Sequence, residues 1–411
     1  MTTLSDPHAS GGGASGGFKP SMLLNDTRYR SLTFQFIALV AIIAAMAFVG
    51  GNLVRNLTAA GLNISYDFLG YQAGYDIGQR LIEYDSQSTH GRAAMVGLLN
   101  TLLVALMACV TATVIGVIAG VLRLSNNWIV AKIMSFYVEI FRNVPVLIWL
   151  LIILSIYINS APQPRAFRGD DATASMKLFD SIAITNRGIY LPSPTFGTGG
   201  MLVVAVFIAS IVGIFLFRKY ARKQLYDHGK LISTFWPSVA IFFVPAILAQ
   251  LVLGNPVGLE YPELKGFNFR GGLTIQGPLL ALWFALSIYT GAFIAENVRA
   301  GIVAVAKGQS EAAGALGLRP GRIMNLVVLP QALRVIIPPL ISQYLNITKN
   351  SSLAIAVGYM DLTGTLGGIT LLQTGRAIES VLLLMMFYLS ISLLISFFMN
   401  IYNNSMKLKE R

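Results

Sequence analysis

A short polar stretch between two long apolar segments carries the residue types best suited to contact with another protein. Residues 311–317 read Glu-Ala-Ala-Gly-Ala-Leu-Gly and follow Ser310. A serine can cap a helix N-terminus, and a glutamate in the first turn favours the helix dipole. Gly317 can adopt the positive φ that ends a helix, and Pro320 prevents its continuation. We therefore expect a very short helix after Ser310, suited to a partner's groove rather than to catalysis; the alternative is an ordinary connecting loop.

Two pairs of opposite charge stand at helical spacing. Glu139 and Arg142 are three residues apart, and so are Glu296 and Arg299. Residues at this spacing lie on one helix face and can neutralise each other. Charges in membrane segments tend to face protein or water rather than lipid. We expect two structural ion pairs near the membrane boundary; for Glu139 and Arg142 a functional gate is the alternative.

The residue types that metal sites and active sites require are sparse. His8, His90 and His228 are far apart in sequence, and the single cysteine, Cys109, lies within an apolar run. The sequence therefore shows no disulfide framework and no Cys/His metal cluster. It also lacks a G-x-x-x-x-G-K-[ST] phosphate loop, so the chain is not expected to bind ATP in that manner or to carry a cofactor.

The composition indicates a membrane protein. Of the 411 residues, 55% are hydrophobic and only 12% are charged, whereas about a quarter are charged in an ordinary soluble domain. Several apolar stretches exceed the roughly 20 residues that cross a bilayer as a helix. The net charge of +12 comes without a basic patch with interleaved aromatic residues, so it does not indicate nucleic-acid binding. We predict an all-α polytopic membrane protein.

The apolar segments predict about eight transmembrane helices. These are residues 32–53, 95–122, 130–158, 200–217, 234–253, 278–300, 327–347 and 380–400. Lys and Arg clusters such as 218–223 mark the cytoplasmic side, which puts both termini inside. Pro145 should kink or restart the third span. The segment 354–368 is too short for a sure span and is expected to be a re-entrant or surface helix.

The GxxxG spacing from Gly116 to Gly120 permits close helix approach, and we expect it to serve packing within the chain rather than a dimer face. The expected organisation has five parts. These are a disordered cytoplasmic tail (1–27), a first transmembrane helix with an external segment (28–94), core helices 1 and 2 (95–158), an external segment with two extra transmembrane helices (159–277), and core helices 3 to 5 (278–411).

Several motifs together resemble the permease subunits of polar-amino-acid ABC importers of the His/Glu/Gln/Arg type. Residues 311–330 are similar to the EAA–G–I-x-LP loop of that family, with Val327 in place of its Ile. Further matches are Asn100-Thr101-Leu102, Tyr137 to Pro145, Ala295-Glu296, Leu329 to Ala332, and Lys349 to Leu353. The long first part and the insertion are similar to the larger permease of general L-amino-acid importers (Aap/Bzt type).

The resemblance implies a type I ABC-importer transmembrane fold, with the insertion between core helices 2 and 3, in a bacterial inner membrane. It implies coupling to a cytoplasmic ATPase pair, which binds ATP and Mg, through Ser310, Glu311, Ala312, Ala313, Gly317, Leu318 and Pro320. The other implied partners are a second, homologous permease subunit, a periplasmic amino-acid-binding protein and an L-amino-acid substrate within the lipid bilayer.

The path of an amino acid needs polar groups for both of its charges. Candidates are Lys349, Asn350, Ser351, Ser352 and Asp361; helix capping and interhelical hydrogen bonding are the alternative roles. An ion-gradient-driven secondary carrier is the main alternative function, but no inverted repeat is evident. A membrane-embedded enzyme would need a cluster of catalytic residues, and the sequence presents none.

Overall fold

The computed structural model describes residues 27–61, 64–169 and 172–406, and it separates into two units that divide after Tyr66. The expected disordered tail lies outside the described residues, except for Thr27 at its end. The first unit contains one long helix, α2 (Thr27–Ala59), most of whose side chains are exposed. Because α2 is apolar around its circumference, lipid is the environment that its sequence suits.

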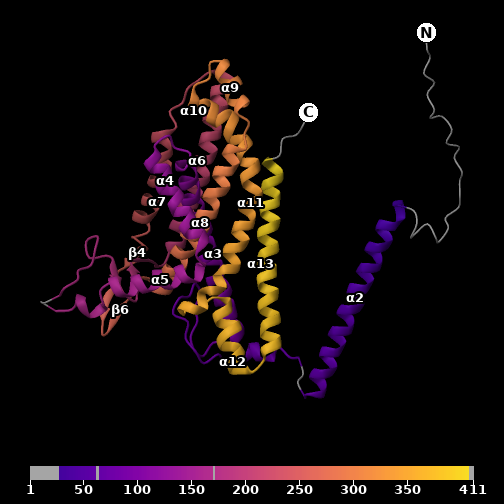
Figure 1. Cartoon of the computed structure of the whole chain (residues 1–411). Coiled ribbons are helices and arrows are strands. Elements are labelled where there is room, and N and C mark those ends of the chain that lie inside the picture. The colour runs from indigo at the N-terminus through magenta and orange to yellow at the C-terminus, as the bar shows by residue number, and fades with distance from the viewer. Residues whose placement is uncertain (1–26, 62–63, 170–171, 407–411) are drawn as a thin grey trace, which may run out of the picture. The chain divides into compact units, whose positions relative to one another are not determined.

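Four helices of the second unit form its core. They are α3 (His90–Leu122), α5 (Val146–Ser160), α8 (Gly277–Val303) and α11 (Leu329–Asn350). Helix α8 contacts each of the other three, and α13 (Ala377–Met406) packs beside α11 (Figure 1). Leu282 and Leu286 of α8 are fully buried in the shared apolar cluster. This arrangement makes α8 the central helix of the bundle.

Small residues let α3 and α8 lie unusually close together. A Cβ on Gly116 would stand 2.5 Å from Cβ of Ile294, and one on Gly120 would stand 2.7 Å from the carbonyl oxygen of Ala295. Real Cβ atoms do not approach that closely, so both positions require glycine. The GxxxG spacing therefore serves packing within the chain, as expected.

Eight helices among the described residues are long and apolar enough to cross a membrane, as predicted. The third predicted span is divided: α4 (Trp128–Asn143) ends before Pro145, and α5 begins after it. Proline has no N–H to donate and fixes its own φ, so a new helix starts there rather than a kinked one. Of the two parts, only the second, from Val146, is long and apolar enough to cross a membrane.

The expectation of an all-α chain holds for the spans but not for the two segments that flank helices α6 (Gly200–His228) and α7 (Phe235–Val252). Seven short antiparallel strands join these segments. One sheet has the order β1 (Ala183–Thr185), β2 (Gly188–Leu191), β7 (Leu273–Gln276). Two further sheets have two strands each: β3 (Ser193–Phe196) pairs with β4 (Val257–Glu260) across the inserted helices, and β5 (Glu263–Lys265) forms a hairpin with β6 (Asn268–Arg270). A short 3-10 turn, η2 (Pro164–Phe167), precedes them. Strands of three or four residues are too short to show a period in the sequence.

The segment between α11 and α13 is irregular and folds back against the bundle. It consists of a 3-10 helix, η4 (Ser351–Val357), a π-helix, η5 (Thr363–Thr370), and one turn of α-helix, α12 (Leu371–Thr374). Leu362 and Leu366 are fully buried. Their burial is incompatible with the surface helix considered for residues 354–368.

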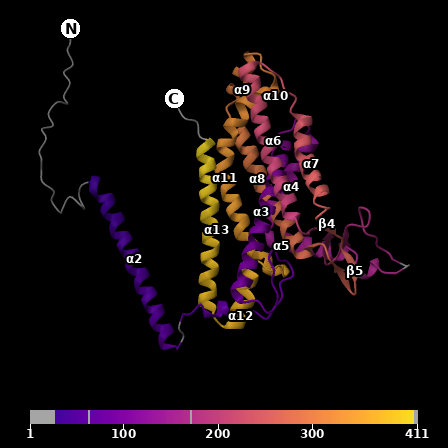
Figure 2. The same cartoon turned by 180° about the vertical axis from the view of Figure 1, so that it is seen from behind.

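Within the second unit, α9 (Lys307–Ala315) and α10 (Pro320–Ile323) lie at one end and α12 lies at the other (Figures 1 and 2). The last described turn of α13 is at the α9 end. Residues 67–89, which include the 3-10 helix η1 (Asp67–Gly70), cover the α12 end of α3. The two ends of the bundle therefore carry different kinds of structure.

Candidate functional site

Helix α9 is the short helix that the sequence predicted, but it begins earlier than expected. Its first residue is Lys307, and Ala306 is its N-cap, without a side-chain hydrogen bond. Ser310 therefore lies inside the helix rather than at its cap, and Glu311 is in its second turn. The end of the helix is as predicted: Gly317 has a φ of +79°, and Pro320 begins the next helix. Proline fits the first turn of α10 because no partner is needed there for its missing N–H.

One face of α9 packs on its own chain and the other is open. Ala313 is buried, and α9 contacts η3 (Met324–Val328), the π-helix that follows α10. Glu311 and Ala312 are exposed, and Leu316 is 83% exposed. In the part of the chain that the structure describes, the Glu311 carboxylate has neither an ion-pair nor a hydrogen-bond partner. An acidic group, small residues and a leucine thus face outward together at the tip of the bundle.

Helix α9 is connected tightly to the core on both sides. Residues 304–306 alone separate it from α8, and Val305 donates a hydrogen bond back to the carbonyl of Ile302. On the other side α10, η3 and α11 follow one another with helical backbone angles. The wider turn of the π-helix precedes Pro330, which cannot donate to the helical ladder. A short connection thus joins α9 to α8, and packing on α10 and η3 joins it to the segment that continues into α11.

Three arginines converge on Glu296 where α3, α4 and α8 meet. Arg123 donates to one carboxylate oxygen, and Arg299 Nη2 lies 2.6 Å from the other. Arg142 Nη1 is 3.8 Å from Glu296, and its guanidinium stands 5.2 Å from the centre of the Phe293 ring. The predicted Glu296–Arg299 pair is thus present, as one edge of a larger cluster.

The predicted pair of Glu139 with Arg142 is absent, although both lie on α4. Glu139 is exposed and belongs to no ion pair among the described residues. Arg142 points to Glu296 because that carboxylate is only 25% exposed, so charges near it are weakly screened. Spacing along one helix could not reveal this choice, because the competing partner lies on another helix.

Two of the predicted pathway residues 349–352 bond to backbone carbonyls at the end of α11. The hydroxyls of Ser351 and Ser352 donate to the carbonyls of Thr348 and Lys349, each at 2.7 Å. Ser351 is buried, Asn350 and Ser352 are half-buried, and Lys349 is exposed. The two serines therefore have the capping role that was the alternative interpretation, which leaves Lys349 as the charged group open to another molecule.

Asp361 lies apart from those residues, between η4 and η5, and is fully buried. Its Oδ1 accepts from the backbone N–H of Gly364 at 2.8 Å, and its Oδ2 accepts from the Tyr388 hydroxyl at 3.0 Å. The described residues provide no cation beside it. Its contacts therefore fix the turn between η4 and η5 to α13.

Two residues near the start of α3 hold the same turn from the other side. Asn100 Nδ2 donates to the carbonyls of Gln79 and Met360, at 2.7 and 2.8 Å. Thr101 Oγ1 accepts from the backbone N–H of Leu362 at 3.0 Å. The sequence shows Asn100 and Thr101 as part of a motif but does not reveal that they hold this turn. The feature that could have indicated it is two adjacent polar residues inside an apolar span.

The sequence did not indicate a role for several other polar side chains inside the bundle. Trp283 donates to Thr111, which also contacts Ser287, and Thr113 contacts the Tyr344 hydroxyl at 2.8 Å. Buried atoms without a partner among the described residues include Asn297 Nδ2 on α8 and Arg334 Nε on α11. A buried polar group without a partner carries a cost in folding free energy.

Comparison with known proteins identifies the class of this chain. The family described as "Binding-protein-dependent transport system inner membrane component" matches residues 225–408. The glutamate/glutamine/aspartate/asparagine transport system permease protein BztB of Rhodobacter capsulatus is 49% identical over the full length of both chains. The chain belongs to the family of amino-acid ABC transporter permeases.

Two further relatives cover nearly the whole permease. The general L-amino acid transport system permease protein AapQ of Rhizobium johnstonii is 44% identical over 94% of each chain. The putative amino-acid ABC transporter permease protein YhdX of Escherichia coli is 43% identical over 96% of this chain and 98% of its own. The resemblance to the Aap/Bzt type is confirmed, and it includes the inserted segment with α6 and α7.

Membership decides between the functions that the sequence left open. Permeases of this family are multi-pass membrane proteins with the type I importer fold, and they are not catalytic. ATP hydrolysis belongs to a separate subunit, and the family implies partner subunits. Neither the secondary carrier nor the membrane-embedded enzyme has support from these relatives.

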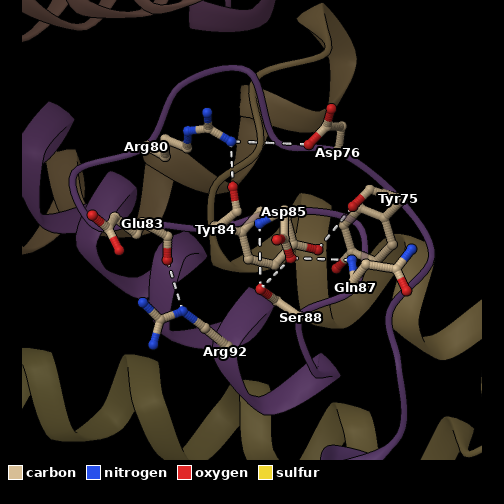
Figure 3. Close-up of polar contacts among 9 residues, drawn as sticks. All are labelled: Tyr75, Asp76, Arg80, Glu83, Tyr84, Asp85, Gln87, Ser88 and Arg92. Carbon is tan, nitrogen blue, oxygen red and sulfur yellow. Dashed lines mark hydrogen bonds and ion pairs between the residues drawn. The ribbon is translucent and has the colours of Figure 1, made fainter.

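The end of the permease opposite α9 carries a cap made of residues 67–89. Its backbone is held by hydrogen bonds such as Ala73 N–H to the Ser88 carbonyl at 2.8 Å. A pocket of about 550 Å³ opens in it, lined by Arg80, Glu83, Tyr84, Asp85, Ser88 and Arg92. Figure 3 shows how each arginine is anchored by a backbone carbonyl, Arg80 by Tyr84 and Arg92 by Glu83.

Two groups that line this pocket have shifted pKa values. The Ser88 hydroxyl, which donates to Asp85 Oδ1 at 2.8 Å, holds the pKa of that carboxyl below its usual value. Burial raises the pKa of the Tyr84 phenol, whose hydroxyl donates to the Tyr75 carbonyl. Asp85 therefore stays charged and Tyr84 neutral near neutral pH, and the pocket presents both signs of charge.

Proposed function

We propose that this permease forms part of the translocation pathway for L-amino acids and that α9 docks into a groove of the ATP-binding subunit. One observation carries the proposal: α9 exposes Glu311, Ala312 and Leu316 at the tip of the bundle, and Glu311 has no partner within the described chain. Small residues allow close approach, a leucine provides apolar contact, and a carboxylate can accept charge-assisted hydrogen bonds.

Closure of an ATPase pair, which binds ATP and Mg, would move α9 as a lever. The three-residue link to α8 supports this idea, and so does the packing of α9 on α10 and η3, which continue into α11. Both helices contribute to the main apolar core, in which Leu286 and Ile347 are fully buried. Movement of α9 would then tilt core helices and open the pathway alternately to the two sides of the membrane.

The α9 end would face the cytoplasm of a bacterial inner membrane, with both termini on that side. Lys307, Arg319 and Arg322 lie at this end, in keeping with the excess of basic residues in cytoplasmic loops. The cap pocket at the other end, with Arg80 and Glu83 at its rim, would receive a periplasmic amino-acid-binding protein. A second, homologous permease subunit would complete the pathway.

The substrate is proposed to be an L-amino acid from a broad set that includes glutamate, glutamine, aspartate and asparagine, by analogy with the names of BztB and AapQ. Lys349 is the candidate on this chain for contact with a substrate carboxylate, since it is exposed at the end of α11. Asn350, Ser351, Ser352 and Asp361 would shape the surrounding backbone rather than bind the substrate.

The substitution Glu311→Lys tests the proposal. Reversing the charge at a docked carboxylate should lower L-glutamate uptake and coupled ATP hydrolysis by at least about tenfold, the equivalent of ~1.4 kcal/mol. Capture of substrate by the binding protein should not change. Asp227→Lys makes the same charge change at an exposed position near the end of α6 and should leave uptake intact. Unchanged uptake in Glu311→Lys would remove the docking claim.

A further inference from the structure

The inserted hairpin of α6 and α7 carries a dense basic cluster at the end where its two helices meet. Residues 218–234 contain five Lys and Arg side chains, His228 and a single carboxylate, Asp227. The Lys and Arg side chains are Arg218, Lys219, Arg222, Lys223 and Lys230, and all are exposed. Helices α6 and α7 pack mainly on each other and only sparsely on the core helices, so most of the hairpin surface is free of contact with the rest of the described chain.

A pocket of about 510 Å³ lies between α6 and the loop that leads into α7. Arg218, Arg222 and Leu225 line it from one face of α6, at spacings of four and three residues. Leu231, Ile232 and Thr234 close it from the connecting loop. Arg218 Nε reaches across to Ser238 Oγ of α7 at 3.4 Å, which directs its guanidinium over the junction. Two guanidinium groups are thus gathered at one small cavity.

Helix α7 begins directly after Thr234, which lines the pocket. Thr234 is the N-cap of α7 and makes no side-chain capping bond. The N–H groups of Phe235 and Trp236 therefore lack a cap at the point where the helix dipole is positive. Backbone donors of this kind bind phosphate oxygens in many proteins.

The rest of the surroundings favour a lipid over a soluble anion. Leu225, Leu231 and Ile232 give the pocket an apolar wall. Phe235 and Trp236 are 64% and 72% exposed beside it. Aromatic side chains prefer the membrane interface, and apolar walls suit the glycerol and acyl portions of a lipid.

We propose that this pocket binds the phosphodiester headgroup of an anionic phospholipid, with Arg218 and Arg222 as its principal ligands. The inserted hairpin then attaches the permease to anionic lipid at one leaflet. This inference is independent of the docking of α9. If these basic residues served only to set the membrane orientation of α6 and α7, no pocket would be needed, and each of them would contribute equally.

Lipid titration of the purified full-length permease, followed by native mass spectrometry, tests the proposal. Phosphatidylglycerol should bind more tightly than phosphatidylcholine. The double variant Arg218→Gln/Arg222→Gln should lose at least about tenfold in affinity for phosphatidylglycerol. The matched variant Lys219→Gln/Lys223→Gln removes the same charge outside the pocket lining and should change that affinity by less than about threefold.

Equal losses in the two double variants would overturn the proposal in favour of general charge attraction, and so would an unchanged affinity in both. Displacement of bound phosphatidylglycerol by millimolar inorganic phosphate would overturn the lipid assignment in favour of a soluble anion. If Arg218→Gln/Arg222→Gln does not fold, Leu231→Glu provides a second test. It places a carboxylate on the exposed wall of the pocket and should also weaken phosphatidylglycerol binding, and undiminished binding would contradict the proposal.

Discussion

At the scale of single residues, the geometry of the permease depends on a few side chains that join helices distant in the sequence. Glu296 accepts from arginines of α3 and α8 and lies close to an arginine of α4. Asn100 and Thr101 tie α3 to the turn between η4 and η5. Each of these contacts joins two different elements. It therefore fixes the position of one element along the other, which hydrophobic packing alone does not determine.

The substitution Glu296→Gln should destabilise the permease. It leaves three guanidinium groups close together without the charge that neutralises them, one of them only 12% exposed. Loss of one partner of such a partly buried cluster costs about 1–3 kcal/mol. Thermal unfolding in detergent should occur at lower temperature, whereas Glu139→Gln, on exposed α4 surface without an ion pair, should leave the unfolding temperature unchanged. Equal effects of the two changes would contradict the cluster's role.

The substitution Gly97→Ala should displace the turn that contains Asp361. An added Cβ would stand 2.2 Å from Thr365 Oγ1 and 2.8 Å from the backbone oxygen of Asp361. Because a backbone atom cannot turn away as a flexible side chain can, the expected cost is about 1–3 kcal/mol. Gly321→Ala, which has nothing within 4 Å, serves as the control in the same unfolding assay. A stable Gly97→Ala protein would show that α3 and η5 are less tightly packed.

At the scale of elements, α9 and its two connections are the part of the permease that we propose to transmit movement. Glycine and proline at positions 317 and 320 predicted where α9 ends, because each restricts the backbone in its own way. Its start was predicted wrongly. The cap preference of Ser310 amounts to about 1 kcal/mol, which one extra helical turn from Lys307 can offset.

Lengthening the link between Ala306 and Lys307 tests the lever directly. Insertion of Gly-Ser-Gly there adds flexible chain without altering the exposed face of α9. The ATP-binding subunit should still bind, and ATP hydrolysis should continue, but uptake should fall by about tenfold or more because displacement of α9 no longer reaches α8. The same insertion at Gly266, in the turn between β5 and β6, should have no such effect. Undiminished uptake with the lengthened link would exclude transmission through α8.

At the scale of the whole molecule, hydropathy alone predicted the eight spans, because a helix in lipid must satisfy its own backbone and be apolar over its length. The local pairs β1–β2 and β5–β6 escaped prediction because their strands are too short to show a period in the sequence. The pairs β2–β7 and β3–β4 escaped because each joins segments on opposite sides of α6 and α7 in the sequence. The pairing of Arg142 with Glu296 was also not predicted, because the two residues lie on different helices, α4 and α8. Local pattern predicts elements well, whereas pairings between distant segments depend on the assembled fold.

The central claim is that α9 contacts the ATP-binding subunit, and cysteine crosslinking in the assembled transporter tests it most directly. Cys109, the single cysteine, lies within α3 and can be changed to alanine to give a clean background. In that background Ala312→Cys on α9 should form a crosslinked product with the ATP-binding subunit. Gln87→Cys in the cap, also exposed, should form none. Absence of the Ala312→Cys product in an actively transporting complex, or labelling of that cysteine from outside intact cells, would contradict the account.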